Sequence, residues 1–332
     1  MKKVAWGILS TARIGREKVI PAMQAARHCD IQAIASRSLE RAQACAGALG
    51  IPRAYGSYEE LFVDPAIEAI YNPLPNEQHV ALTLQAARAG KHVLCEKPMA
   101  LRAGEIEALR EVAGRVHIME AFMVRFHPQW ERVRALVRGG GLGPVRSIQS
   151  YFSYYNRDPA NIRNHDYQGG GSLYDIGCYA IVTARYLFEA EPLRVVALVD
   201  RDPDFGTDRV VSALLDFGAG RRLDFTVSTQ TAPYQRVNVC GERRRIEVRI
   251  PFNAPLGGPT DILIDDGTAL DGSAIQTETL PACNMYGLQG DVFSRVVRGD
   301  MPLPYGIDDA IRNMRVIDAL FASEESGGWV VV

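Results

Sequence analysis

The sequence predicts a chain of two parts: an α/β part with a doubly wound parallel sheet, then an α+β part with a large, mostly antiparallel open sheet. Over roughly the first 120 residues, short apolar runs alternate with helical patterns, an order typical of parallel sheets. Beyond residue 145, strand-like runs follow one another, separated by turn residues such as those at 216–220. The length of 332 residues and the 47% hydrophobic content allow two cores, and we place the domains at 1–122 and 123–332.

The first half is expected to hold strands that are apolar along their whole length, as strands buried on both faces are. They are expected at 3–9, 31–35, 67–71, 93–95 and 116–120. Helical patterns lie between these strands, and two of them stop at Gly50 and Gly90. The expected helices run from Val19 to Ala26 and over 39–49, 58–62, 77–89, 104–113 and 128–138.

The second half is expected to be dominated by short strands joined by turns. Strands are expected at 145–155, 194–200, 209–217, 222–229, 236–239 and 245–250. One helix, at about 176–187, interrupts them, and two more, near 288–298 and 308–323, close the chain. The sequence leaves open whether these last two helices pack on the first half.

Charge, cysteine and hydropathy patterns exclude several classes of function. The net charge is −2, without the basic stripe that nucleic-acid binding needs. The six cysteines are scattered, so we expect reduced thiols, no disulfide framework and no metal site. No apolar run approaches the roughly 18 residues of a membrane span, and the chain starts directly in a strand without an export signal. We therefore expect a cytoplasmic protein without a nucleic-acid or membrane partner.

The turn after the first strand has the position of a dinucleotide fingerprint. Ser10, Ala12 and Gly15 occupy its three glycine positions, between a strand and a helix. Small residues there allow the backbone to approach a pyrophosphate at a helix N-terminus. Ser and Ala make this a degraded fingerprint, and an ordinary turn between a strand and a helix is the alternative.

The end of the second strand favours NADP over NAD. NAD-binding chains usually place an acid there to hold the ribose 2′-hydroxyl. This chain has Ser36 and Arg37 instead, and Arg41 follows one helical turn later. A guanidinium group pairs well with a 2′-phosphate. The alternative is that Arg37 is a solvated loop charge.

Lys97 follows the apolar run 93–95 directly, between Glu96 and Pro98. In open α/β sheets, ligands bind just beyond the carboxyl ends of the strands, so a lysine here is placed to meet one. An exposed Glu–Lys pair at an ordinary strand end is the alternative.

Asp175 and Tyr179 lie four residues apart after the run Gly169–Gly171, so a helix that begins near Asp175 puts both on one face. The glycines allow a ligand to come close. A tyrosine is a poor base at neutral pH unless a nearby cation such as Lys97 lowers its pKa. The alternative is that Asp175 is an N-cap and Tyr179 a packed aromatic residue.

Four further residues are weighed on position alone. His79, early in a helix, and His117, inside a strand, are expected to be structural. Arg163 and His165 lie in the loop ahead of the glycines and are candidates for substrate contacts, although a surface role for Arg163 is equally consistent. The chain has no GxSxG, HExxH or P-loop motif.

These motifs together resemble the Gfo/Idh/MocA family of glucose–fructose oxidoreductases and inositol dehydrogenases. The matching segments extend in family order over both halves: 7–15, 35–37, 54–61, 73–76, 89–98, 119–128 and 169–179. Many members end the last segment in His, whereas this chain has Tyr179. That resembles the branch with glucose–fructose oxidoreductase, NADP-dependent D-xylose dehydrogenase and dimeric dihydrodiol dehydrogenase.

The resemblance implies a Rossmann dinucleotide-binding domain at 1–122, a substrate and dimerisation domain at 123–332, and a cis peptide bond before Pro98. It places the catalytic residues at Lys97, Tyr179 and Asp175. It implies the cofactor contacts Ser10, Thr11, Ala12, Arg13, Ile14, Ser36, Arg37, Arg41, Leu74, Pro75, Asn76, His79, Glu96 and Lys97. The substrate candidates are Arg125, Arg163 and His165.

The expected function is therefore NADP-dependent hydride transfer to or from a sugar or cyclic diol, with Tyr179 as acid and base and Lys97 as its cationic partner. An enzyme that keeps its NADP bound and couples two aldoses is one alternative. A non-catalytic NADP or sugar sensor is another, although a sensor has no need of a matched Lys97–Tyr179 pair. We expect a homodimer or larger homo-oligomer through the second sheet.

Overall fold

The structure is a computed structural model that describes residues 2–332, and it divides into two compact units. The first unit comprises the chain up to Met123 together with Asn284–Met314. The second unit comprises Val124–Cys283 and Arg315–Val332. Each unit has its own sheet, and each is described separately below.

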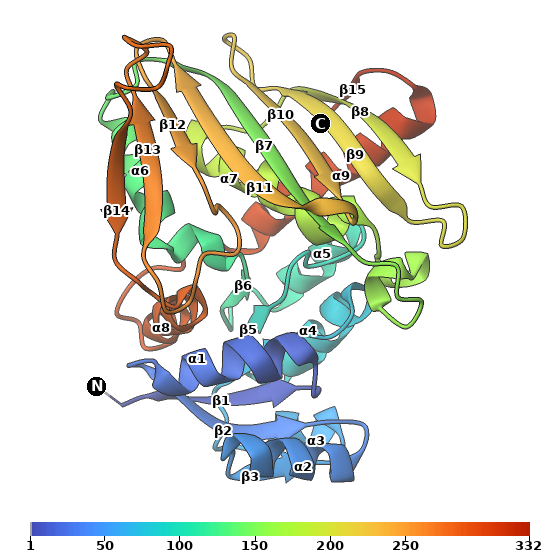
Figure 1. Ribbon diagram of the computed structural model, residues 1–332. Helices are drawn as coiled ribbons and strands as arrows, with labels where there is room; N and C mark the ends of the chain where they lie inside the picture. Colours follow the sequence, from blue (N-terminus) through green and yellow to red (C-terminus); the bar gives the residue numbers. More distant parts are fainter. Residues whose placement is uncertain (1) are drawn as a thin grey trace. The chain divides into compact units, whose positions relative to one another are not determined.

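The first unit is built on a six-stranded parallel sheet (Figure 1). Its strands are β1 (Val4–Leu9), β2 (Cys29–Ala35), β3 (Arg53–Tyr55), β4 (Ala69–Asn72), β5 (His92–Cys95) and β6 (Ile118–Glu120). Their order in the sheet is β3-β2-β1-β4-β5-β6. The order reverses between β1 and β4, and in such sheets the crevice beyond the carboxyl ends of these two strands binds the ligand. The predicted Rossmann sheet is confirmed.

Helices connect these strands. They are η1 (Gly15–Val19), α1 (Ile20–Ala25), α2 (Leu39–Leu49), α3 (Tyr58–Val63), η2 (Asn76–Gln78), α4 (His79–Arg88), α5 (Ala103–Ile106) and η3 (Glu107–Glu111). Ser38 and Ser57 cap α2 and α3, since each hydroxyl accepts a hydrogen bond from the backbone N–H three residues on. The helix expected over 104–113 is instead the short α5 followed by a 3₁₀ turn.

The segment 284–314 completes the first unit. It contains α8 (Met285–Val297) and the start of α9 (Ile307–Ser326). Trp6 Nε1 donates to Ser294 Oγ at 3.1 Å, and the backbone N–H of His28 donates to Asp291 at 2.6 Å. The first of the two closing helices therefore packs on the first unit, next to its parallel sheet, an arrangement that the sequence left open.

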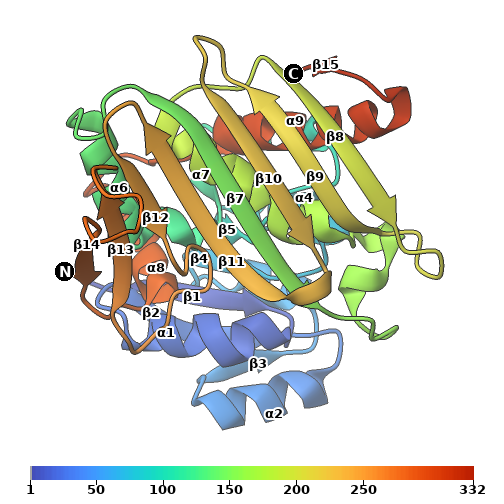
Figure 2. The ribbon, with the colours of Figure 1, turned by 45° about the horizontal axis from the view of Figure 1, so that its top comes forward.

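The second unit contains a nine-stranded, mostly antiparallel sheet (Figure 2). Its strands are β7 (Val145–Tyr155), β8 (Arg194–Arg201), β9 (Asp208–Asp216), β10 (Arg222–Ser228), β11 (Gln230–Gly241), β12 (Arg245–Val248), β13 (Thr260–Asp265), β14 (Gln276–Leu280) and β15 (Val330–Val331). Their order is β14-β13-β12-β11-β7-β10-β9-β8-β15, and only β7 and β10 pair in parallel. The predicted open sheet is confirmed, but the sequence missed β13, β14 and β15.

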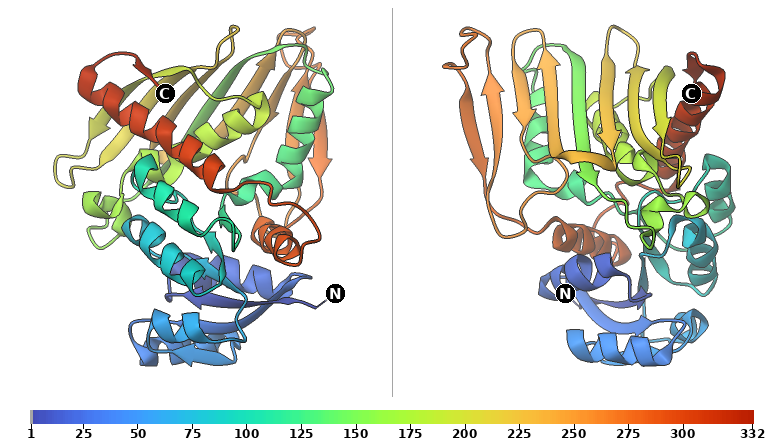
Figure 3. Two further views of the ribbon diagram at one scale, coloured as in Figure 1. Left: turned by 180° about the vertical axis from the view of Figure 1, so that it is seen from behind. Right: turned by 45° about the vertical axis from the view of Figure 1, so that its right-hand side comes forward.

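Helices cover one face of this sheet, as Figure 3 shows from behind. They are α6 (Pro128–Arg138) and α7 (Cys178–Phe188), and the last part of α9 lies beside β8, where Ser323 accepts a hydrogen bond from the backbone of Ala197. The remaining short turns are η4 (Met123–Phe126), η5 (Ile162–Asn164), η6 (Asp166–Gln168) and η7 (Leu173–Gly177). The other face of the sheet carries no helix (Figure 2).

Two further properties of residues 2–332 concern membrane-spanning helices and metal-binding groups of side chains. No helix in this range is both long and apolar enough to cross a membrane. No group of His, Cys, Asp or Glu side chains in the same range is arranged to hold a metal ion.

Candidate active site

The turn after β1 explains how the degraded fingerprint keeps its shape. Ser10 has φ 61°, in the left-handed region that glycine usually occupies. Its hydroxyl accepts a hydrogen bond from the backbone N–H of Ala12 at 3.2 Å, which stabilises the turn locally. The carbonyl of Thr11 accepts a bond from Arg16, while Arg13 forms an exposed ion pair with Glu17 at 2.9 Å. Serine therefore adopts the tight turn that the first fingerprint glycine would supply.

Ile14 is the N-terminal flanking residue of η1, a π-helical turn that leads into α1. Ala12 and Gly15 keep this region free of bulky side chains, and a Cβ added at Gly15 would make only ordinary contacts, 3.8 Å from Ile20 at the nearest. The backbone after β1 thus meets the steric demand of a pyrophosphate at a helix N-terminus.

At the end of β2, Ser36 is buried and its backbone N–H donates to the carbonyl of Tyr55 at 3.1 Å. Its hydroxyl accepts a bond from Ser38. The side chains of Arg37 and Arg41 are exposed, and the backbone of Arg41 is fixed by the Ser38 cap. Two guanidinium groups are therefore exposed around the strand end where an acid would select NAD.

The turn after β4 is held by buried polar groups. Asn72 is fully buried; its amide donates to the carbonyl of His79 at 3.2 Å, and its oxygen accepts from the backbone of Leu74 at 3.3 Å. The ring of His79 is also fully buried, with Nδ1 2.8 Å from the Pro98 carbonyl and Nε2 2.6 Å from the Leu74 carbonyl. Burial lowers the pKa of His79, and a neutral imidazole donates to only one of these carbonyls. His79 thus connects the 73–76 turn to the chain beyond Lys97.

Pro75 and Asn76 complete this turn, since η2 begins at Asn76 and Pro75 is its flanking residue. Both are partly exposed. They lie between Asn72, at the carboxyl end of β4, and His79, at the start of α4, and both of these side chains are fixed by hydrogen bonds.

The segment around Lys97 is fixed on both sides. The Glu96 carboxylate accepts a hydrogen bond from the hydroxyl of Tyr71 at 2.7 Å. The Lys97–Pro98 peptide bond is cis, as the resemblance implied. Beyond it, the backbone N–H of Met99 donates to buried Glu120 at 2.8 Å. Side chains from α4 and β6 therefore hold the main chain after Lys97, and Tyr71 of β4 holds the Glu96 side chain before it. Lys97 itself follows β5 and is partly exposed.

In the second unit, Asp175 lies on the π-turn η7 and Tyr179 on the first turn of α7. Asp175 does not cap a helix with its side chain. Its Oδ2 accepts a hydrogen bond from Tyr154 at 2.6 Å and pairs with Arg163 Nε at 2.9 Å. The N-cap alternative for Asp175 is thus excluded, and Arg163 lies beside a predicted catalytic residue.

Tyr179 packs in an aromatic cluster and is 6% exposed. Its ring centroid is 6.2 Å from that of Phe152 on β7 and 5.5 Å from that of Phe252. Rings on two sides restrict the rotation of the tyrosine and fix the direction of its hydroxyl.

The glycine run before η7 serves contacts within the protein. A Cβ added at Gly170 would lie 2.5 Å from the carbonyl oxygen of Arg163. At Gly171, which has φ +103°, a Cβ would overlap the carboxylate of Asp208. Asp208 in turn accepts bonds from Ser172 Oγ at 2.9 Å and from the backbone of Leu173 at 2.7 Å. The glycines therefore allow the preceding loop and Asp208 to dock, whereas the sequence suggested an approach by a ligand.

The remaining substrate candidates have structural contacts of their own. His165 Nδ1 lies 2.8 Å from Gln168 Oε1, and its Nε2 lies 2.8 Å from the Pro159 carbonyl. These contacts raise the pKa of His165, the Pro159 carbonyl most of all. Arg125, on η4, is buried. Neither arrangement tests a substrate role, which stays a prediction.

Sequence reasoning missed Tyr154, Asp208 and Glu120. Tyr154 lies in the alternating pattern of β7, and Asp208 is the first residue of β9, so neither stands out from an ordinary strand residue. Glu120 is the last residue of β6 and pairs in register with Cys95 at the end of β5, so its place at the carboxyl end of a strand could have drawn attention to it.

The class of protein follows from comparison with known families. Residues 4–124 match the oxidoreductase family with an NAD-binding Rossmann fold, and residues 130–247 match the GFO/IDH/MocA C-terminal domain. The chain belongs to the Gfo/Idh/MocA family and is an oxidoreductase with an NAD(P)-binding Rossmann domain.

Its relatives include enzymes of sugars and diols. The chain is 40% identical to D-xylose 1-dehydrogenase (NADP(+)) 2 of Haloferax volcanii, with 98% of each chain covered. It is 32% identical to trans-1,2-dihydrobenzene-1,2-diol dehydrogenase of Xenopus laevis, with 78% of each covered. Among solved structures it resembles aldose-aldose oxidoreductase from Caulobacter crescentus complexed with glycerol, at a TM-score of 0.91 and 27% identity, with 100% of both chains covered.

Proposed function

We propose that this protein is an NADP-dependent dehydrogenase that oxidises a hydroxyl group of an aldose or a cyclic diol. The observation that carries the proposal is the fixed setting of Lys97, held by Tyr71–Glu96, His79 and Glu120 at the carboxyl end of β5. A lysine whose main chain is held this firmly is suited to orienting a reacting oxygen. The named activities of the D-xylose and dihydrodiol dehydrogenases support the substrate class.

In the proposed reaction, Tyr179 takes the proton of the substrate hydroxyl as its C–O bond becomes a carbonyl. When bound, NADP⁺ would supply the acceptor for the hydride that leaves the carbon bearing this hydroxyl. Lys97 donates a hydrogen bond to the reacting oxygen and favours the phenolate form of Tyr179. Asp175 orients Lys97 or a second hydroxyl. In the reverse direction Tyr179 returns the proton to the carbonyl oxygen.

The cofactor contacts that we propose follow the strand ends. The Ser10–Ile14 turn would hold the pyrophosphate, and Leu74, Pro75, Asn76, Glu96 and Lys97 would contribute further contacts to the cofactor. Arg37 and Arg41, with Ser36, bind the 2′-phosphate. His79 acts through the two carbonyl groups that it contacts. What supports this assignment is the left-handed Ser10 and the two exposed guanidinium groups.

The catalytic roles are tested by Tyr179→Phe and Lys97→Ala. Each variant is expected to lose at least about 10²-fold in kcat while NADPH fluorescence titration still shows binding, because acid–base groups contribute that much to rate. Near-normal turnover in either variant would end this assignment. A screen of NADP⁺ reduction over aldoses, inositols and cyclic diols identifies the substrate.

The cofactor choice is tested by fluorescence titration with NADPH and NADH. We expect tighter binding of NADPH, and Arg37→Gln to remove about tenfold or more of that preference, since a guanidinium–phosphate pair is lost. Arg27→Gln, an exposed arginine elsewhere in the first unit, is the matched control. Equal affinities in the wild type would contradict the NADP assignment.

A second candidate is an enzyme that keeps NADP bound and couples oxidation of one aldose to reduction of another. The similarity to aldose-aldose oxidoreductase over the whole chain favours it. Retention of NADP through gel filtration, with turnover in the absence of added NADP, distinguishes it from the first. Hydride transfer missing from every substrate despite tight NADPH binding would point instead to a sensor.

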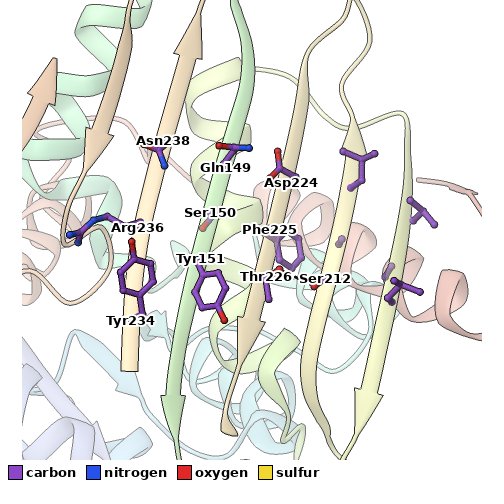
Figure 4. A pocket seen from close by; sticks show the side chains of 15 residues that line it. Gln149, Ser150, Tyr151, Ser212, Asp224, Phe225, Thr226, Tyr234, Arg236 and Asn238 are labelled. Carbon is purple, nitrogen blue, oxygen red and sulfur yellow. Dashed lines mark hydrogen bonds between the residues drawn. The ribbon is translucent and has the colours of Figure 1, made fainter. Parts of the chain in front are cut away.

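We also propose a homodimer through the open face of the second sheet. A shallow pocket lies there over β11, β7, β10, β9 and β8 (Figure 4). Leu198 is 79% exposed at one side, and Tyr234 stacks edge-on against Tyr151, with ring centroids 5.6 Å apart. Light scattering should show Leu198→Arg as a monomer. Val63→Arg, at a residue that is 76% exposed in the first unit, should leave the oligomer intact.

A further inference from the structure

Building on the proposed function, we infer that Arg163 is an electrostatic positioning residue for Tyr179. Its guanidinium group neutralises Asp175 one helical turn before Tyr179, and so keeps the phenol able to act as a base. The sequence left this arginine as a candidate for a substrate contact or a surface charge. Its observed partner gives it a different role.

The contacts of Asp175 are the first support. Arg163 Nε lies 2.9 Å from Asp175 Oδ2, and Tyr154 donates its hydroxyl hydrogen to the same oxygen at 2.6 Å. Asp175 raises the pKa of Arg163, and a smaller contribution in the same direction comes from Tyr179. Arg163 is therefore paired with the carboxylate that lies four residues before Tyr179, and it stays cationic at every working pH.

The backbone of Arg163 is fixed as firmly as its side chain. Its carbonyl accepts a hydrogen bond from Gly171 at 2.9 Å, and the carbonyl of His165 accepts one from Gly170 at 3.0 Å. Close packing against Gly170 leaves no room for a side chain there. The loop is thus docked on the strand-to-helix connection that leads to Tyr179, and the ion pair has little freedom to rearrange.

Several elements around Tyr179 in the second unit supply charged or titratable groups, and one of them is β9, whose Asp208 accepts hydrogen bonds from Ser172 and Leu173 at the start of η7. The η5 turn supplies Arg163, and η7 supplies Asp175. Strand β7 supplies Phe152, an apolar ring, and Tyr154, which is joined to Asp175. The third neighbour, Phe252, is also apolar. The proposed reaction adds a second cation, Lys97, which favours the phenolate form of Tyr179.

Arg163 and Asp175 carry opposite charges near Tyr179, so removing one or the other should shift the pH dependence of oxidation in opposite directions. Without Arg163, the Asp175 carboxylate repels the phenolate, so oxidation should require a higher pH. Without the Asp175 charge, Arg163 favours the phenolate, so oxidation should persist to lower pH. Removing both should return the profile near that of the wild type, because the pair is close to neutral.

The experiment is the pH profile of kcat/KM for NADP⁺-linked oxidation by the full chain. Arg163→Gln is expected to move the midpoint of the acidic limb up by about one pH unit, and Asp175→Asn to move it down by a similar amount. The double variant is expected within about 0.3 unit of the wild type. Arg163→Lys, which keeps the charge, should keep the wild-type midpoint.

Arg157→Gln is the matched control. Arg157 lies on the same loop, is 41% exposed compared with 44% for Arg163, and pairs with Asp204 and Asp202. It should leave the midpoint unchanged. NADPH titration and thermal melting establish that each variant is folded, and Arg163→Lys covers the case in which Arg163→Gln is not.

Two outcomes would overturn the inference separately from the proposed function. If the wild type turns over and Arg163→Gln raises KM without moving the midpoint, Arg163 is a substrate contact only. Shifts of the same sign in Arg163→Gln and Asp175→Asn would likewise exclude charge compensation. Absence of hydride transfer by the wild type would overturn the proposed function and this inference with it.

Discussion

The two units hold their key side chains by different means. Around Lys97, the chain is extended, and buried polar side chains of β4, α4 and β6 bind its main-chain or neighbouring groups. Tyr179 lies on a helix, where aromatic rings restrict it and a charge network surrounds its turn. An extended strand exit leaves backbone groups that other elements must bind, whereas a helix satisfies its own and is positioned through side chains and close packing.

The difference predicts that the second unit is the more sensitive to added volume. Gly170→Ala places a methyl group against the Arg163 carbonyl, so the docked loop has to move. We expect kcat to fall by about 10²-fold, since displacement of a catalytic group by about 1 Å has effects of that size. Steady-state kinetics with saturating NADP⁺ measures it.

Gly257→Ala is the control, because a Cβ there meets nothing within 4 Å. Its activity and melting temperature should match the wild type. An active Gly170→Ala enzyme with an unchanged melting temperature would show that the glycine run has no part in positioning Tyr179.

Asp208, whose buried carboxylate packs against Gly171, should make the free energy of unfolding depend on pH. Burial raises the pKa of Asp208 to about 6, although bonds from Leu173 and Ser172 oppose the shift. The folded protein therefore holds this proton more tightly than the unfolded chain does, and the contribution to stability is lost as pH rises from about 4 to about 6. Urea unfolding at pH 4 and pH 7 should show that Asp208→Asn loses less stability over this range than the wild type, by about 2 kcal/mol. Parallel losses in both proteins would contradict this origin.

In the first unit, the hydrogen bond from the Met99 backbone N–H to Glu120 is tested by removing its acceptor. Glu120→Ala leaves the buried N–H of Met99 without its bond, at a cost of about 1–3 kcal/mol in the free energy of unfolding. We expect about a tenfold loss of kcat as the segment after Lys97 loosens. Glu120→Gln keeps an acceptor oxygen and should retain most of the activity. Equal losses in the two variants would point to the charge of Glu120 and not to its hydrogen bond.

The smallest expected effect concerns the attachment of α8 within the first unit. Arg298 lowers the pKa of Glu68 to about 2 through a hydrogen bond, with N–O at 2.7 Å. This contribution to stability is present above about pH 4.5 and is lost as pH falls towards 2. Since both groups are partly exposed, Arg298→Gln should cost below about 1 kcal/mol at pH 7, and its difference from the wild type should shrink by pH 3. Arg295→Gln, on the same helix, should show neither effect.

Much of the architecture and the candidate site could be predicted from local pattern. Apolar runs located β1, β2, β4 and β5, and turns and alternation located β7 to β10. Strands β13 and β14 were missed because half of the residues of β13 and four of the five residues of β14 are polar, and because both lie at the side of the sheet. Their pairing partners, not their own composition, make them strands.

The sequence alone determined the dinucleotide-binding sheet, the second open sheet, and the positions of Lys97, Asp175 and Tyr179 along the chain, because periodicity and short motifs are local properties. Only the tertiary structure decided what those residues contact. Tyr154 and Arg163 reach Asp175 from 21 and 12 residues away, and Asp208 lies 36 residues beyond Ser172, which it binds. Such contacts depend on how helices and strands pack together, and the spacing of residues along the sequence does not give their distances in the folded protein. The glycines illustrate the limit: their presence was visible in the sequence, but the atoms that required them were not.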